Sequence, residues 1–228
     1  AEDAARAVPG VTNSEGGNAS ASLAAHALIT SHGFAAGYKV TGFSLSASVL
    51  AGVGGDMQRD YDWHSARYLS DCEAAEEIGR RAGERAVARL NPGTLASGRM
   101  PVLFDPRVSA SLIGHLLSGL SGPSVARGKS YLIAHEGKQL FPADIFIDDD
   151  PLRPRGLRSR AFDGEGLPTR GGAIVDAGTI RPWLCDAASA RQLGRVPTGH
   201  ASGGGGVSTG NLTLRPGTQS RDAMMADI

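Results

Sequence analysis

Small and apolar residues recur every three or four positions between residues 73 and 90, the period of an α-helix with one buried face. Ser70 and Glu73 have the spacing of a capping box, in which each side chain satisfies an unpaired backbone N–H. The turn-forming residues 91–93 end the pattern. We therefore predict a long surface helix. Its buried face consists of Ala75, Ile78, Ala82, Ala86 and Leu90.

A second helical pattern begins at Asp105, a residue type that caps helix N-termini, and at Pro106, which fits the first helical position. The pattern runs to about Leu117 or Gly119, and its apolar residues are so widely distributed that we expect a helix buried on most of its circumference. Residues 100–104, directly before it, predict a short strand. The apolar positions are Val108, Ala110, Leu112, Ile113, Leu116 and Leu117.

Strand patterns occupy much of the remaining chain. Between about Ala19 and Val53, runs of small and β-prone residues broken by glycines predict three or four antiparallel strands. Residues 199–210 are too rich in glycine for a regular element and predict a loop, while an amphipathic helix begins near Ser220. Further strands are predicted at 130–133, 145–147, 172–175 and 179–184.

These elements indicate an α+β fold, with antiparallel or mixed sheets, a long surface helix and a buried central helix. We expect residues 1–60 to form the β-rich end of an N-terminal domain and residues 61–98 to form the long helix and a linker. Residues 99–228 are expected to form a central or C-terminal β-rich domain that is truncated at its C-terminus.

Composition excludes several classes of partner. Lys and Arg total 23, Asp and Glu total 23, and both signs are spread along the chain, so neither a nucleic acid nor a membrane surface is favoured. No apolar run reaches the roughly 18 residues of a membrane span. Cys72 and Cys185 do not make a disulfide framework, and a reducing cytoplasm is the expected compartment.

Histidine-based metal chemistry has little support from spacing. His135 and Glu136 begin a zinc-hydrolase phrase, but Gln139 stands where the second histidine is required, so we interpret the segment as an exposed turn. His26 and His32 lie six residues apart in a strand-like region, roughly 20 Å if extended, which is too far to share a metal without a sharp turn.

Two acidic clusters flank a run of arginines. Residues 148–150 form the first cluster and Asp163 with Glu165 the second. Oxygen-rich turns can bind Ca²⁺ or Mg²⁺, but the spacing is not that of an EF-hand, and ion pairing within the chain is the preferred interpretation. Nucleophilic catalysis has no signature, since Ser111 and His115 have an ordinary helical spacing. The arginines are Arg153, Arg155, Arg158 and Arg160.

A set of short phrases, ordered over about 200 residues, carries more information together than any one alone. The phrases are residues 11–16, 102–106, 112–117, 149–152 with Gly156, 159–166 and 189–191, followed by Thr198-Gly199 and Asn211-Leu212. Together they resemble the TldD/PmbA family, also described as modulators of DNA gyrase, and specifically its PmbA (TldE) branch. The chain then corresponds to a fragment of the full-length protein.

The resemblance implies a hetero-oligomeric metalloprotease that trims or degrades peptides and small unfolded proteins. In such a pair the TldD-like partner carries a HExxxH helix that binds zinc. Aligned on His115, this chain has Ala110 at the first histidine and Ser111 at the glutamate, so we expect no catalytic residue and no zinc in this chain. His115 is expected to be a core histidine hydrogen-bonded to the backbone, and Asp163 and Glu165 are candidates for lining a cleft.

The leading hypothesis is therefore a non-catalytic subunit of a TldD/PmbA-type metalloprotease. One alternative is an independently active metallopeptidase that uses unusual ligands, such as His115 with Asp163 or Glu165. Another is a binding modulator of DNA gyrase, to which the balanced charge lends no support.

Overall fold

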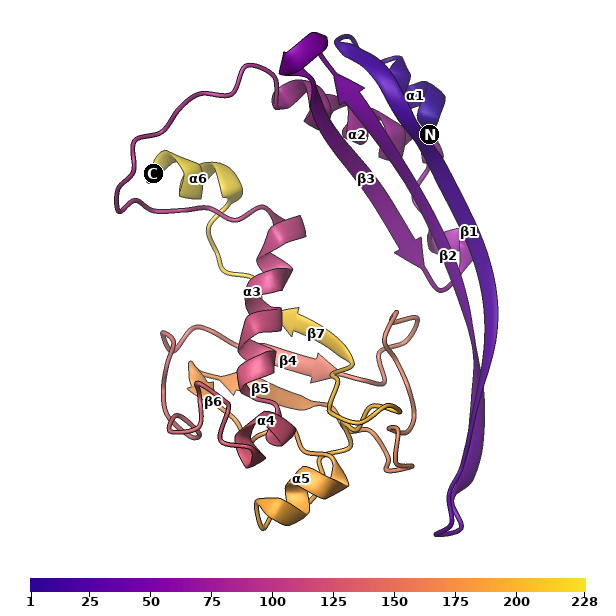
Figure 1. The fold of residues 1–228 in the computed structure, drawn as a ribbon, viewed down its shortest axis with the longest axis vertical. Helices are drawn as coiled ribbons and strands as arrows, with labels where there is room; N and C mark the ends of the chain where they lie inside the picture. The colour runs from indigo at the N-terminus through magenta and orange to yellow at the C-terminus, as the bar shows by residue number, and fades with distance from the viewer. The chain divides into compact units, whose positions relative to one another are not determined.

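The computed structural model describes all 228 residues and divides them into two compact units (Figure 1). Unit 1 comprises Ala1–Ala27 and Gly37–Ser97, and unit 2 comprises Leu28–Ala36 and Gly98–Ile228. Both units combine helices with an antiparallel sheet, which confirms the α+β class. None of the helices combines the length and apolar character needed to cross a membrane.

The first sheet has the order β1-β2-β3 and consists of β1 (Val11–Ile29), β2 (Ala35–Ala51) and β3 (Gln58–Ala66). The prediction of three or four strands between 19 and 53 is wrong, because two long strands cover this region. Gly33, with φ +87°, lies between β1 and β2, whereas the other glycines predicted to break strands lie inside β2. A glycine is compatible with an extended backbone, so it does not by itself end a strand.

Helix α2 (Ala75–Ala88) packs on β3 and on α1 (Glu2–Arg6) within unit 1. The predicted buried face is confirmed, since Ile78, Ala82 and Ala86 are fully buried. The predicted capping box is wrong. Ser70 lies in the 3-10 helix η2 (Leu69–Asp71), its hydroxyl donates to Asp71, and α2 begins after Ala74 without a side-chain cap.

Charged residues secure the same helix to the sheet. Asp62 of β3 is only 5% exposed, and its two carboxylate oxygens accept hydrogen bonds from Arg81 and Arg85 of α2. Neighbouring Asp60 is equally buried and pairs with Arg89 at 3.4 Å. Two alternate residues of β3, Asp60 and Asp62, thus direct carboxylates at α2 rather than apolar side chains, which the sequence pattern did not indicate.

The second sheet has the order β6-β5-β4-β7. Its strands are β4 (Ile147–Asp150), β5 (Gly172–Asp176), β6 (Thr179–Ile180) and β7 (Asn211–Leu214). The strand predicted at 172–175 is confirmed, the one at 145–147 is displaced toward β4, and the one at 179–184 is shortened to β6. No strand forms at 130–133, where the Ser130 hydroxyl accepts the N–H of Leu132 in a turn. The pattern missed β7.

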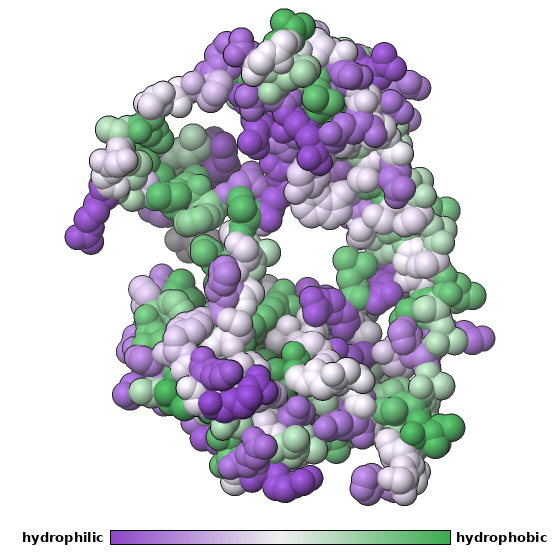
Figure 2. Space-filling model, viewed as in Figure 1, coloured by the Kyte–Doolittle hydropathy of each residue, from purple (hydrophilic) through white to green (hydrophobic).

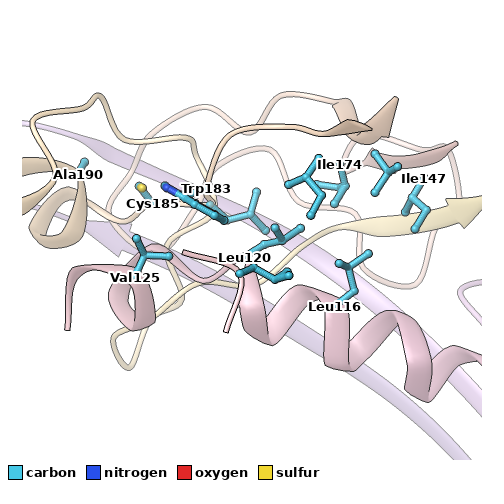
Figure 3. Packing of buried hydrophobic residues seen from close by; sticks show 12 residues of the cluster. Leu116, Leu120, Val125, Ile147, Ile174, Trp183, Cys185 and Ala190 are labelled. Atoms are coloured by element: carbon cyan, nitrogen blue, oxygen red, sulfur yellow. The ribbon is translucent and has the colours of Figure 1, made fainter. Parts of the chain in front are cut away.

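Helix α3 (Pro106–Gly119) contributes to the core of unit 2 mainly through its C-terminal end. Leu116 and Leu120 pack with Ile147 and Ile174 of the sheet and with Trp183, as Figure 3 shows. The helices α4 (Gly122–Ala126) and α5 (Ala187–Gln192) contribute Val125 and Ala190 to the same core.

The expectation that α3 is buried on most of its circumference is wrong, because Val108 and Leu112 are about half exposed. The predicted strand at 100–104 is also absent, and this segment has no regular secondary structure and is exposed. Apolar residues are therefore visible on the surface of the segment that leads into α3 and near α6 (Arg221–Ala226), the predicted terminal helix (Figure 2).

Candidate functional site

The candidate site is built on α3, and the start of this helix follows local rules. Oδ1 of Asp105 accepts a hydrogen bond from the backbone N–H of Arg107 at 2.9 Å, and Pro106 occupies the first turn. The predicted cap and the predicted end of the helix near Gly119 are confirmed. Tyr131 steadies the C-terminal half by donating its hydroxyl to the carbonyl of His115 at 2.6 Å.

A groove of about 740 Å³ runs along α3. One wall is a face of α3 that includes Ala110, Ile113 and Leu117, and the opposite wall comprises residues 207–210 with Leu212 and Leu214 of β7. The lining of this groove combines apolar side chains with hydroxyl groups. The hydroxyl residues are Ser109, Ser118, Ser121, Ser124, Ser208 and Thr209.

A different polar cluster joins β4 to the loop before β7. Nε2 of His200 lies 3.2 Å from Oδ2 of Asp149, and this oxygen also accepts the N–H of Gly210 at 3.0 Å. Nδ1 of His200 lies 2.9 Å from Oγ1 of Thr198, which accepts the N–H of Cys185 at 2.8 Å. Asp149 is 3% exposed, and its Oδ1 is buried without a hydrogen-bond partner.

Comparisons with known proteins agree with this fold. Residues 1–90 match the model of the PmbA/TldA metallopeptidase central domain, and residues 97–228 match that of the C-terminal domain. Over 193 residues the chain is 38% identical to the metalloprotease PmbA of Escherichia coli O157:H7, covering 85% of this chain and 43% of that protein. This chain belongs to the PmbA/TldD family, in its PmbA (TldE) branch.

Other family members support the same assignment. The metalloprotease PmbA homolog of Haemophilus influenzae is 33% identical over 193 residues, again 85% of this chain and 43% of that protein. A Thermotoga maritima structure named as a modulator of a DNA gyrase has a TM-score of 0.90 and 26% identity, covering 99% of this chain and 52% of its own. TldE from Thermococcus kodakarensis shares the fold, with a TM-score of 0.80 at 22% identity. The match covers 93% of this chain and 49% of that one. The chain spans less than half the length of the curated relatives it matches.

The family name includes metallopeptidase, and a catalytic zinc site would need specific ligands in the groove. Zinc takes its protein ligands from His, Cys, Asp and Glu. No residue of these types lines the groove, whose only charged residue is Arg158. Elsewhere in the chain, no group of three or more such residues is placed to hold a metal ion. The residues present therefore do not fit a catalytic zinc site.

The three positions predicted to correspond to the HExxxH phrase have different surroundings in the structure. Ala110 lines the groove, whereas Ser111 and His115 do not. The hydroxyl of Ser111 donates to the carbonyl of Val108 at 2.6 Å. The expectation of a core histidine is wrong, since His115 is exposed and its imidazole makes no hydrogen bond. Leu116, the next residue, faces the core instead.

Asp163 and Glu165, the candidate cleft residues, bind backbone groups. Oδ1 of Asp163 accepts the N–H groups of Glu165 and Leu167, both at 2.9 Å, and its Oδ2 accepts that of Ala201 at 3.1 Å. Glu165 accepts the N–H of Ala187 at the start of α5. Both carboxylates are engaged in holding loops together. The alternative in which they join His115 on a metal has no support in this geometry.

The three consecutive aspartates of β4 have different partners. Asp148 pairs with Arg215, and this hydrogen bond holds the pKa of the carboxyl below its usual range. Asp150 lies 3.7 Å from Arg153, which confirms the predicted ion pairing for that residue. Alternation along the strand turns Asp149 inward, toward His200. The sequence reading missed His200, whose only signal was its place directly after the family phrase Thr198-Gly199.

Three other histidines, His26, His32 and His135, are not placed to bind a metal together. His135 begins a turn, as predicted, but the turn is not exposed there: His135 and Glu136 are half-buried, and Nδ1 of His135 is buried without a hydrogen-bond partner. Glu136 pairs with Arg195 of the loop after α5. His26 stacks on Tyr38 of the neighbouring strand, with ring centroids 5.0 Å apart, and His32 lies in the turn between β1 and β2.

Proposed function

We propose that this chain is a non-catalytic subunit of a TldD/PmbA-type metalloprotease complex, which acts on peptides and small unfolded proteins. The observation that carries the proposal is the composition of the groove along α3. Ala110 lies on its wall at the position of the family's first zinc-binding histidine, and the lining contains no His, Cys, Asp or Glu. A TldD-like partner would supply the zinc and the catalytic glutamate.

The residues of the groove suit substrate binding better than catalysis. A catalytic zinc usually has three protein ligands and a nearby base for its bound water, and Ala110 and Ser111 provide neither. The groove does have apolar walls with interspersed hydroxyl groups and a volume of about 740 Å³, a combination that suits polypeptide segments of varied sequence. We infer that this subunit shapes a space for substrate. The two unpaired cysteines are consistent with a cytoplasmic complex.

Co-expression tests the proposal directly. This chain, in its full-length form, is produced alone and together with a HExxxH-bearing family member, and zinc content and cleavage of an unfolded peptide are measured. We expect a stable complex, zinc in the partner only, and chelator-sensitive cleavage only when the partner is present. One zinc per chain and cleavage by this chain alone would overturn the proposal.

The names of several relatives point to a second candidate, the binding of DNA gyrase. The balanced charge of 23 basic and 23 acidic residues does not favour contact with DNA, so such binding would have to be to the protein. Capture of gyrase, and not of a HExxxH-bearing family member, by the tagged chain would favour this candidate over the metalloprotease subunit.

A further inference from the structure

Unit 2 contains a second cavity, of about 470 Å³, on the other side of Leu184 from the groove along α3. Leu184 is the one residue that lines both. A cavity of this size accepts a small molecule or one to two residues of a peptide. Neither the sequence patterns nor the family names assign it a role.

The walls of this cavity are apolar and stiff. Pro168, Pro182 and Pro197 come from three different loops, and the fixed φ of proline limits how far each loop can move. Leu167 and Ile174 complete an apolar surface, so a ligand that fills the cavity would bury hydrocarbon. A preformed apolar cavity binds such a group with little cost in ordering.

The charged groups of the lining determine which ligand charge the cavity favours. Arg170 is exposed and forms neither an ion pair nor a hydrogen bond, whereas Arg181 is paired with Asp176. The one carboxylate in the lining, Asp149, is 3% exposed; its Oδ2 is engaged by His200 and Gly210, and its Oδ1 is buried without a hydrogen-bond partner. Arg170 is therefore the one charged side chain of the lining that is both exposed and unpaired, and guanidinium groups bind carboxylates through two parallel hydrogen bonds.

We propose that this cavity binds a ligand with a terminal carboxylate and an apolar body, namely the C-terminal residue of a peptide, with Arg170 as the carboxylate partner. The identification of the ligand as a peptide rests on the proposed function. The apolar side chain of the terminal residue packs among the three prolines. The cavity then holds one end of a peptide next to the groove along α3, with Leu184 between them.

A matched pair of probes separates the carboxylate from the apolar body. N-acetyl-L-leucine and N-acetyl-L-leucinamide are titrated into the ¹⁵N-labelled protein, and chemical shifts of the backbone amides of Ala173, Thr198 and Gly199 are followed. We expect saturable shifts with the acid and at least tenfold weaker binding of the amide. Arg170→Gln should weaken binding of the acid by about tenfold or more, the usual effect of losing a charged hydrogen bond. Arg191→Gln, a change of an exposed arginine on α5 outside the lining, should leave binding unchanged.

Equal binding of the acid and the amide, equal binding by the Arg170→Gln protein, or no saturable binding would overturn the inference. The measurement uses this chain without a partner, so it is independent of complex formation. If the chain forms a complex with a zinc-bearing partner but does not bind N-acetyl-L-leucine, the proposed function stands and the carboxylate site is rejected. If the chain binds N-acetyl-L-leucine but forms no complex with such a partner, the carboxylate site stands and the proposed function is rejected.

Discussion

Nε2 of His200 lies 3.2 Å from Oδ2 of Asp149, although 51 residues separate the two along the chain. Both side chains are almost completely buried, with 11% and 2% of their surfaces exposed. The contact joins β4 to the loop that leads to β7, and Gly210 of that loop donates to the same carboxylate. This pair is therefore a connection between segments that are distant in sequence, and it should contribute to the stability of unit 2.

Removal of the imidazole should destabilise unit 2. His200→Ala leaves the buried carboxylate of Asp149 with only the hydrogen bond from the Gly210 N–H, and we expect a loss of about 3 kcal/mol in the free energy of unfolding. Urea unfolding followed by the fluorescence of Trp183, which is 3% exposed in the same core, measures the loss. Arg215→Gln, which removes the exposed pair with Asp148, is the control and should cost about 1 kcal/mol or less. Equal losses would contradict the argument.

Two glycine-to-alanine changes in helices should have opposite effects. A Cβ at Gly83 of α2 would lie 2.7 Å from Val8 and 2.8 Å from the carbonyl oxygen of Ala5, whereas a Cβ at Gly114 of α3 would meet nothing within 4 Å. Alanine favours a helix by about 1 kcal/mol over glycine. Gly114→Ala should therefore raise the unfolding free energy by up to about 1 kcal/mol, and Gly83→Ala should lower it by about 1–3 kcal/mol through overpacking. Thermal unfolding followed by circular dichroism measures both, and a stabilising Gly83→Ala would show that α1 moves aside.

Adjacent tryptophan substitutions test the groove along α3. Ala110 lines the groove and Ser111 does not, so Ala110→Trp should fill part of it while Ser111→Trp should leave it open. In the complex with a zinc-bearing partner, we expect Ala110→Trp to reduce kcat/KM for an unfolded peptide by about tenfold or more, with the zinc content unchanged. The Ser111→Trp complex should cleave at the rate of the unmodified one. Equal rates for both variants would show that the groove does not bind substrate.

Acid should abolish the contribution of Asp186, the N-cap of α5. Burial by itself raises the pKa of this carboxyl, but hydrogen bonds from the hydroxyl and the N–H of Ser189 outweigh burial and leave the pKa below its usual value of 3.8. A carboxyl with a lowered pKa stabilises the fold above about pH 4, and this contribution disappears as the pH falls through the folded-state pKa. Asp186→Ala should therefore cost about 1 kcal/mol or more at pH 7 and progressively less below pH 4. Urea midpoints of both proteins between pH 7 and pH 2.5 measure this difference, and a constant gap would refute it.

Local rules accounted for where helices begin and end. Asp105 and Pro106 set the start of α3 because a carboxylate accepts the N–H two residues on and proline needs no N–H partner at this position. Ser70 and Glu73 have the spacing of a capping box but form no cap. The chain folds into the 3-10 helix η2 at Ser70, and α2 begins only after Ala74. A local pattern is decisive only when the neighbouring segment lets the backbone adopt the required geometry.

Burial and cavities depend on segments far apart in the sequence. Val108 and Leu112 follow a helical stripe but stay about half exposed, because only the C-terminal end of α3 meets the sheet. Asp163 looked like a cleft residue, yet its carboxylate accepts N–H groups from its own turn and from Ala201, 38 residues away. No periodicity within one segment contains information about such partners.

The sequence by itself determined the family and the α+β class, and it predicted that Ala110 and Ser111 stand where the family's zinc-binding phrase would lie, because residue identity and local spacing are written in the chain. Only the tertiary structure decided that Ala110 faces a groove while Ser111 and His115 do not, and that His200 meets Asp149. Those relationships arise when distant segments pack together to bury apolar surface and to pair the polar groups that burial removes from water.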